Sequence, residues 1–328
     1  MPVTMSKCFF FPLGPLLMFC MTLAAQTSIQ PGSTSKVQPL TSEKRAALEE
    51  FQRRMRLSYV DPIIGGKVAA ALETAKTHLL AIESPRRFTQ SFTRLVQNIS
   101  KDKHLALAYA SSSPRANQSP SKLGPSSKHY DVKRIELLSG GLAYLRIDGF
   151  TRLPESKTEF ECAFQLLSNA DALVLDLSKN GGGNPDTVAL VGGYLLGPNK
   201  EIAKLIDRNG VVLTTIRTPN TPSRFAGPVE VIVSPATFSA GEGLAFILQQ
   251  QGRAEIIGQR TAGAANPGKF EPITPHFQAF IPETRVLEPT SGTNWERGVS
   301  PDVKARLSES KRVAFSRARS AVSSATKD

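Results

Sequence analysis

The chain has 328 residues, of which 40% are hydrophobic and 21% are charged. This is enough apolar sequence for a globular domain with a smaller one beside it, and it argues against an intrinsically disordered chain. The formal net charge is +12 at pH 7, but no zinc-finger, helix-turn-helix or aromatic RNA-binding motif accompanies it, so nucleic-acid binding is not expected.

The first 25 residues have the pattern of a cleavable secretory signal. Lys7 gives the start a positive charge, an almost wholly apolar run follows, and the small residues Ala24 and Ala25 end it. Prolines interrupt the run, which favours cleavage over a permanent membrane anchor. We therefore expect an exported protein, periplasmic or extracellular, with no stable membrane span after cleavage. An uncleaved signal that anchors the chain is the weaker alternative.

A spacer and three helices are predicted next. Residues 26–41 are rich in Ser, Thr, Pro and Gln and contain few apolar residues. Between residues 42 and 100, apolar residues recur at helical spacing in three stretches. Asp61 and Ser84, each followed by proline, mark the starts of the second and third helices. A strand is expected at residues 104–109.

Beyond a Ser-, Pro- and Gly-rich linker at residues 111–129, predicted strands and helices alternate. Apolar strands are expected at residues 142–147, 172–177, 229–233 and 255–257. A helical apolar face lies between the first two, and further helices are expected after Pro185 and from Ala240. This alternation predicts an α/β domain.

Ser239 stands where a hydrophobic strand gives way to a helix. The strand stops at Ser234 and Pro235, and the helix begins directly after Ser239. The hydroxyl is thereby placed at the positive end of a helix, where the N–H of Ala240 can face an oxyanion on a substrate carbonyl. A serine at this position also serves as an ordinary helix cap, so the motif alone does not decide between the two roles.

A second motif is the glycine turn that follows the strand at residues 172–177. Glycines let backbone amides approach a ligand, and we expect Gly182 and Gly183 to supply the other oxyanion donors. A tight turn or a phosphate-binding loop is the alternative. No Walker lysine follows the glycines, so nucleotide binding is not expected.

Neither a metal nor another cofactor is expected. After loss of the predicted signal only Cys162 remains, which excludes a disulfide framework in the exported chain. None of the four histidines has a partner at metal-ligand spacing.

Together and in this order, the two motifs resemble the tail-specific (carboxyl-terminal processing) protease family, in particular the branch without a PDZ domain that is related to interphotoreceptor retinoid-binding protein. The resemblance runs through DKHLALAY, GGLAYLRIDGF, DLSKNGGG, SPATFSAGE, IIGQRTAGAANPG and GTNWERGVSPDV. It implies an α/β protein with a crotonase-like (ClpP-like) β/α core and an N-terminal helical bundle. It also implies a serine peptidase with Ser239 as the nucleophile and Gly182 with Ala240 at the oxyanion hole.

The sequence departs from the family at two positions. Many members place a lysine base 25 residues beyond the serine, where this chain has Ala264, and the next lysine, Lys269, is out of register. Ser178 stands where relatives commonly carry an arginine that would brace the glycine turn, so its presence predicts a weaker oxyanion hole.

Another residue must therefore accept the proton of the Ser239 hydroxyl. His104 lies in a segment that looks like the one supplying the histidine of tricorn-type relatives, and Glu296 resembles their orienting carboxylate. The resemblance thus implies a triad of Ser239, His104 and Glu296, in which the imidazole accepts the hydroxyl proton.

The predicted function is hydrolysis of peptide bonds in a protein or peptide substrate. The alternative is a non-catalytic binding protein for an apolar ligand on the same fold, motivated by the retinoid-binding relatives and by Ala264. The predicted organisation is a signal peptide at 1–25, a spacer at 26–41, an N-terminal helical bundle domain at 42–110, a linker at 111–129, a catalytic domain at 130–309 and a basic C-terminal tail at 310–328.

Overall fold

The computed structural model describes residues 40–110 and 130–325, and these residues form one compact unit. The predicted signal peptide and the linker lie outside the described residues, as does the predicted spacer except for its last two positions. Among the helices that are described, none is both long enough and apolar enough to cross a membrane.

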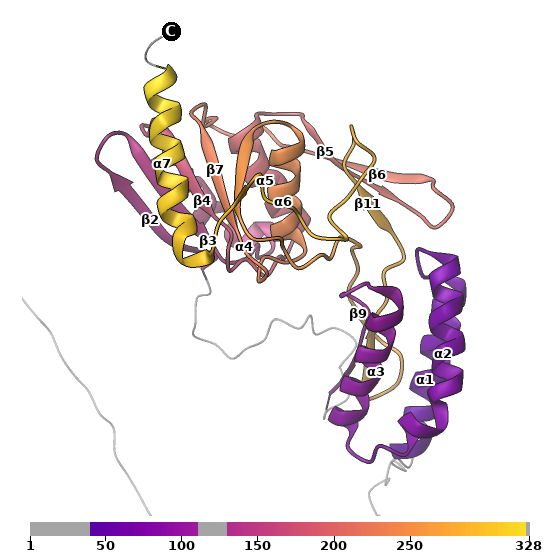
Figure 1. The fold of residues 1–328 in the computed structure, drawn as a ribbon. Coiled ribbons are helices and arrows are strands. Elements are labelled where there is room, and N and C mark those ends of the chain that lie inside the picture. Colours follow the sequence, from indigo (N-terminus) through magenta and orange to yellow (C-terminus); the bar gives the residue numbers. More distant parts are fainter. Residues whose placement is uncertain (1–39, 111–129, 326–328) are drawn as a thin grey trace, which may run out of the picture. The chain divides into compact units, whose positions relative to one another are not determined.

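Three helices open the described chain (Figure 1): α1 (Leu40–Leu57), α2 (Pro62–Leu80) and α3 (Pro85–Ser100). The side chains of Asp61 and Ser84 accept hydrogen bonds from backbone N–H groups in the first turns of α2 and α3, as the Asp-Pro and Ser-Pro pairs predict. The apolar faces of the three helices meet in a core that contains Phe51, Phe88 and Phe92.

A small antiparallel sheet packs on the same core. It consists of β1 (Ala106–Tyr109), β10 (Phe277–Phe280) and β9 (Phe270–Pro272), in the spatial order β1-β10-β9. Leu107 of β1 pairs with Ala279 of β10, and both are buried with the helices. The helical N-terminal region therefore includes a hairpin from the C-terminal half of the chain.

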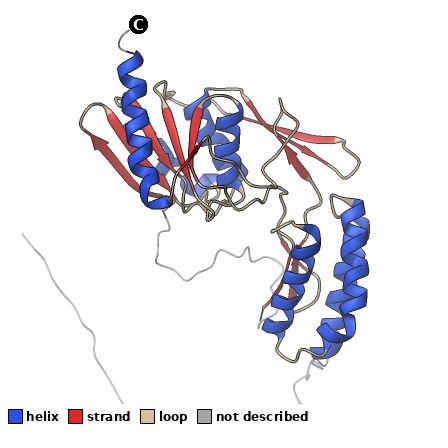
Figure 2. Ribbon diagram, in the orientation of Figure 1, coloured by secondary structure: helices blue, strands red, loops and turns tan. Residues whose placement is uncertain are grey.

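A six-stranded sheet forms the centre of the α/β core (Figure 2). Its strands, in spatial order, are β12 (Val303–Lys304), β8 (Ala254–Gly258), β7 (Val229–Val233), β4 (Ala172–Asp176), β3 (Leu142–Ile147) and β2 (Val132–Leu138). All neighbouring pairs are parallel except β2 with β3. Every residue of β4 and β7 is buried, because both faces of the sheet are covered.

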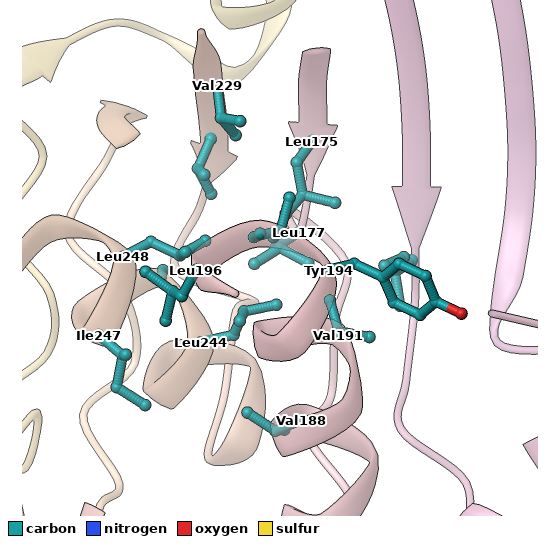
Figure 3. Packing of buried hydrophobic residues seen from close by; sticks show 14 of the residues in the cluster. Leu175, Leu177, Val188, Val191, Tyr194, Leu196, Val229, Leu244, Ile247 and Leu248 are labelled. Atoms are coloured by element: carbon teal, nitrogen blue, oxygen red, sulfur yellow. The ribbon is translucent and has the colours of Figure 1, made fainter. Parts of the chain in front are cut away.

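Alternate strand residues enter two hydrophobic clusters. One cluster lies under α4 (Leu153–Leu166), α5 (Pro185–Leu196) and α6 (Ala240–Gln250). In it Leu175 of β4 packs with Val191 of α5 and Leu244 of α6 (Figure 3). The other cluster contains Val174 of β4 and Ala318 of α7 (Leu307–Ala325). This architecture confirms the predicted fold class.

A third sheet of three antiparallel strands completes the core. Its order is β11 (Arg285–Leu287), β5 (Glu201–Ile206) and β6 (Val212–Arg217). Residues from all three strands line the cavity beside Ser239 that is described below.

Helix α7 crosses the predicted boundary between the catalytic domain and a basic tail at residue 310. Ala314 and Ala318 are fully buried on the central sheet, while Arg312, Arg317 and Arg319 lie on its more exposed faces. The basic residues of this segment predicted a separate tail. The two small apolar residues, one helical turn apart, instead determine how the segment packs.

Candidate active site

Ser239 lies between β7 and α6, as predicted. The turn before it is fixed to the end of the neighbouring strand β4. The Ser234 hydroxyl donates a hydrogen bond to the Ser178 carbonyl over 2.6 Å. The Thr237 hydroxyl donates to the Leu177 carbonyl over 2.8 Å. These buried bonds determine where the chain leaves the sheet and therefore where Ser239 is presented.

The backbone of Ser239 is strained. Its φ is +52° and its ψ is −120°, a combination that residues with a side chain rarely adopt. The fully buried Glu242 stabilises it, because Glu242 Oε2 accepts the Ser239 N–H over 2.8 Å. Its Oε1 accepts the Thr261 hydroxyl over 2.5 Å and the Gly263 N–H over 2.6 Å. A strained strand-to-helix turn of this kind exposes a nucleophile in other hydrolases.

The structure brings His104 to Ser239. His104 Nε2 lies 3.1 Å from Ser239 Oγ. The imidazole stacks on Phe280, with ring centroids 5.2 Å apart, and contacts Phe238 at 5.1 Å. Burial lowers the pKa of His104, and the negative charge of Asp102 opposes that shift. A neutral imidazole at this distance can accept the hydroxyl proton.

Glu296 is not joined to His104 by a hydrogen bond or ion pair among the described residues. Its Oε2 accepts the N–H groups of Ala265 and Asn266 over 2.8 and 3.3 Å. Its Oε1 is buried and has no hydrogen-bond partner in the described part of the chain. Burial, and after it the charge of Asp102, raises the pKa of Glu296 to about 7. The orienting role of Glu296 stays a prediction.

The acid beside His104 is Asp102, which the sequence analysis missed. Asp102 Oδ1 lies 3.9 Å from His104 Nδ1 and accepts the backbone N–H of His104 over 2.9 Å. Asp102 Oδ2 accepts the hydroxyl of Tyr59 over 3.0 Å. The signal was present in the motif DKH, since an acid two residues before a candidate base can reach it once the chain turns after a helix.

The glycine turn lies directly against Ser239. A Cβ built on Gly182, whose φ is +91°, would stand 2.8 Å from the Cβ of Ser239. The Gly182 N–H, however, donates to Asn180 Oδ1 over 2.9 Å. The N–H groups of Gly183 and Ala240 make no hydrogen bond within the described residues, and both residues line the same cavity as Ser239. The N–H groups of Gly183 and Ala240 are thus free to act as oxyanion donors. The N–H of Gly182, also a predicted donor, is already bonded to the Asn180 side chain.

Asn180 braces the glycine turn where an arginine at position 178 was expected to do so. Its side chain is fully buried, and Nδ2 donates to the Ile147 carbonyl over 3.1 Å. The Asn180 carbonyl accepts the N–H of Phe238, the residue before the candidate nucleophile, over 2.9 Å. One side chain and its backbone therefore join the glycine turn to the turn that carries Ser239.

No lysine in the described part of the chain hydrogen-bonds to Ser239. Ala264 is fully buried at the expected lysine position. The Lys269 side chain is 78% exposed and pairs with Glu271 at 3.3 Å. The ammonium of Lys103 donates to the carbonyl of Ala262.

An apolar cavity of about 110 Å³ adjoins Ser239. Ile202 and Leu205 of β5, Val286 of β11 and Trp295 form much of its wall. Gly183 and Ala240, the two residues with free amides, stand at the same cavity. An apolar side chain can therefore enter it while the adjoining carbonyl meets the hydroxyl and the amides.

Comparison with known proteins assigns a family. A model described as "Peptidase family S41" matches residues 141–305. The chain is 28% identical over 163 residues to carboxyl-terminal-processing peptidase 3, chloroplastic, of Arabidopsis thaliana, covering 49% of this chain and 31% of that protein. It is also 28% identical over 225 residues to a carboxyl-terminal-processing protease of Picosynechococcus sp.. That match covers 63% of this chain and 50% of the relative. The chain thus spans half or less of the length of these curated relatives.

Among solved structures, the photosystem II D1 C-terminal processing protease has a similar fold. The TM-score is 0.54 at 18% identity, and the alignment covers 85% of this chain and 98% of that one. The matched family region runs from β3 to β12 and includes Ser239, the glycine turn and Glu296, while His104 lies before it. The predicted tail-specific protease family is confirmed by these matches, and its relation to interphotoreceptor retinoid-binding protein stays a prediction. The chain belongs to peptidase family S41.

Proposed function

We propose that this chain is a serine peptidase that hydrolyses peptide bonds in a protein or peptide substrate through an acyl-enzyme on Ser239. The observation that carries the proposal is the 3.1 Å contact between Ser239 Oγ and His104 Nε2. A serine hydroxyl is a weak nucleophile, and a positioned base contributes roughly 10²- to 10⁴-fold in rate. Membership of the S41 family supports the same reaction class.

In the acylation step, Ser239 Oγ bonds to the substrate carbonyl carbon while its proton passes to His104 Nε2. The N–H groups of Gly183 and Ala240 stabilise the oxyanion, together with the positive end of α6. The carbon–nitrogen bond then breaks as His104 returns the proton to the leaving amine. In deacylation, His104 takes a proton from water as the water oxygen bonds to the ester carbon. The ester C–O bond then breaks, His104 returns the proton to Ser239 Oγ, and the carboxylic acid product leaves.

The cavity beside Ser239 supports a substrate preference. At about 110 Å³ and with an apolar wall, it suits a small or medium apolar side chain on the residue before the scissile bond. Trp295 and Ile202 leave a charged side chain there without a partner, which is costly in a buried site.

The proposal includes export, which rests on the pattern of the first 25 residues. It is tested by expressing the full chain in a bacterium, fractionating the cells and sequencing the N-terminus of the mature product. Cytoplasmic, uncleaved product would exclude export by this signal.

Peptide cleavage tests the proposed activity. Wild-type protein is incubated with a peptide library, and cleavage sites are read by mass spectrometry beside the variant Ser239→Ala and the control Ser320→Ala, at an exposed position of α7. We expect cleavage after apolar residues by wild type and none by Ser239→Ala. Cleavage that survives in Ser239→Ala would refute the proposal.

The alternative function, a non-catalytic protein that binds an apolar ligand, gains no support from the cavity. Its volume of about 110 Å³ is below the roughly 300–1,000 Å³ of pockets that enclose a drug-sized ligand. Saturable uptake of an apolar ligand that is unaffected by Ser239→Ala would favour this alternative.

A further inference from the structure

Unpartnered polar atoms gather around Asp102, behind His104. Of the five buried side-chain atoms that lack a hydrogen-bond partner among the described residues, three lie here: His104 Nδ1, Asn266 Oδ1 and Glu296 Oε1. Asp102, Asn266 and Glu296 line one cavity of about 410 Å³. Buried polar atoms are normally paired, so several exceptions in one place point to a role beyond packing.

Three carboxylates line this cavity, those of Asp61, Asp102 and Glu296, and Asp102 accepts the most hydrogen bonds. Its Oδ1 accepts the backbone N–H of His104, and its Oδ2 accepts both the Tyr59 hydroxyl at 3.0 Å and Asn266 Nδ2 at 3.4 Å. Its side chain is 2% exposed. Glu296 has two backbone donors on one oxygen and none on the other. Hydrogen bonds to a carboxylate favour its charged form.

Two interacting buried carboxylates do not both ionise readily. Burial and the charge of Asp102 raise the pKa of Glu296 to about 7. The charge of Asp102 also favours the protonated form of His104, whereas burial of the imidazole disfavours it. The other ionisable groups that line the cavity are Tyr59, whose pKa is raised by burial, Arg297, and Asp61 and Arg285, which pair at 3.7 Å. The nearby ammonium of Lys103 is turned to the Ala262 carbonyl. The negative charge that faces the imidazole is therefore that of Asp102.

We propose that Asp102, rather than Glu296, is the positioning residue of His104. The inference rests on the proposed function, because imidazolium forms only if His104 takes the Ser239 proton. In that step the proton moves to Nε2, Nδ1 keeps its own proton, and Asp102 remains ionised and stabilises the positive charge. At 3.9 Å the contact is electrostatic rather than a hydrogen bond.

The test compares Asp102→Asn with Glu296→Gln in the full chain, since each keeps side-chain size and removes one acidic group. The His104 imidazole is titrated by NMR, its signal being assigned by its loss in His104→Gln. We expect the pKa of His104 to fall in Asp102→Asn and to change less in Glu296→Gln.

We also expect kcat/KM on a cleaved peptide to fall by about 10²-fold or more in Asp102→Asn, with the acid limb of its pH profile displaced to lower pH. Asp207→Asn, in the exposed β5–β6 turn, is the matched control.

An unchanged His104 titration in Asp102→Asn, or a larger fall in Glu296→Gln, would overturn the inference. If Asp102→Asn lowers the pKa of His104 but the wild-type chain cleaves no peptide, the proposed function is refuted while the pairing of Asp102 with His104 is supported. Should Asp102→Asn fail to fold, Asp102→Ser repeats the comparison, because a serine hydroxyl also accepts the His104 N–H.

Discussion

At the scale of single residues, the site depends on two side chains held in unfavourable states. Ser239 has a strained backbone, a cost of roughly 1–3 kcal/mol, which the hydrogen bond to the buried Glu242 helps to offset. His104 is buried between Phe238 and Phe280, and this burial keeps the imidazole neutral and ready to accept a proton. Reactivity is therefore supplied by the surroundings of both residues.

The acid limb of the pH–rate profile reports His104. Because burial lowers its pKa from 6.5 despite the charge of Asp102, the base stays neutral in mildly acidic solution. We expect kcat/KM to fall with a midpoint below 6.5 as the pH decreases through the pKa of His104. His104→Gln should lose most activity together with this limb. A midpoint above 6.5 in wild-type protein would contradict the assignment of His104 as the base.

Gly182→Ala should disable the site even though its amide is not a free donor. The new methyl group would lie 2.8 Å from the Cβ of Ser239, at a φ of +91° that favours glycine. Displacing the turn misplaces the Gly183 amide, and loss of one oxyanion donor costs about 10²- to 10³-fold in kcat. Peptide kinetics measure this, and Gly210→Ala, in an open turn with positive φ, is the control. Equal activity of the two variants would be inconsistent with this geometry.

Sequence motifs and the family resemblance predicted Ser239, His104 and the glycine turn, which the structure brings together, and their catalytic roles stay predictions. The sequence was insufficient for Asp102 and Asn180. Their roles arise from a turn after a helix and from a contact between the turn that follows β4 and the last residue of β3, neither of which follows from residue type. The hydrogen bond from the Gly182 N–H to Asn180 depends on the orientation of one peptide plane. A glycine-rich sequence permits several orientations, so this bond could not be predicted.

At the scale of elements, helices α1 to α6 and most of the buried strands of the central sheet were predicted, whereas helix α7, strand β2 and most strands of the two smaller sheets were not. β4 is apolar up to its last residue, Asp176, and β7 is apolar except for Glu230. The predicted helices show clear apolar faces. β9, β10 and β11 have only three or four residues each, too few for a period to emerge. The β5–β6 hairpin was also missed, and it supplies part of the cavity wall at Ser239.

Helix α7 should be essential to the stability of the core. Ala318 is fully buried against the central sheet, so Ala318→Asp places an unpaired charge in an apolar contact. We expect the free energy of unfolding in urea to fall by at least about 3 kcal/mol. Ser320→Asp, at an exposed position of the same helix, should change it little. A stable Ala318→Asp protein would mean that α7 is a detachable tail.

At the scale of the whole molecule, the site joins two parts of the fold. His104 and Asp102 follow the N-terminal helices, whereas Ser239 and the glycine turn belong to the six-stranded sheet. The pairing of β1 with β10 and the contact between His104 and Ser239 link these parts within one compact unit.

Unfolding should therefore be a single event. Trp295 is the only tryptophan and is buried beside Ser239, so its fluorescence reports the core, while far-UV circular dichroism also reports α1 to α3. We expect the two urea transitions to coincide. A helical signal lost at clearly lower urea than the fluorescence would indicate an N-terminal region that folds separately.

Covalent labelling tests the central claim most directly, namely that His104 activates Ser239 as a nucleophile. Folded protein is reacted with a fluorophosphonate, and the adduct is located by peptide mass spectrometry with its rate of formation. We expect one adduct, on Ser239, that forms at least about 10²-fold more slowly in His104→Gln. No adduct on Ser239, or an equal rate in His104→Gln, would contradict it.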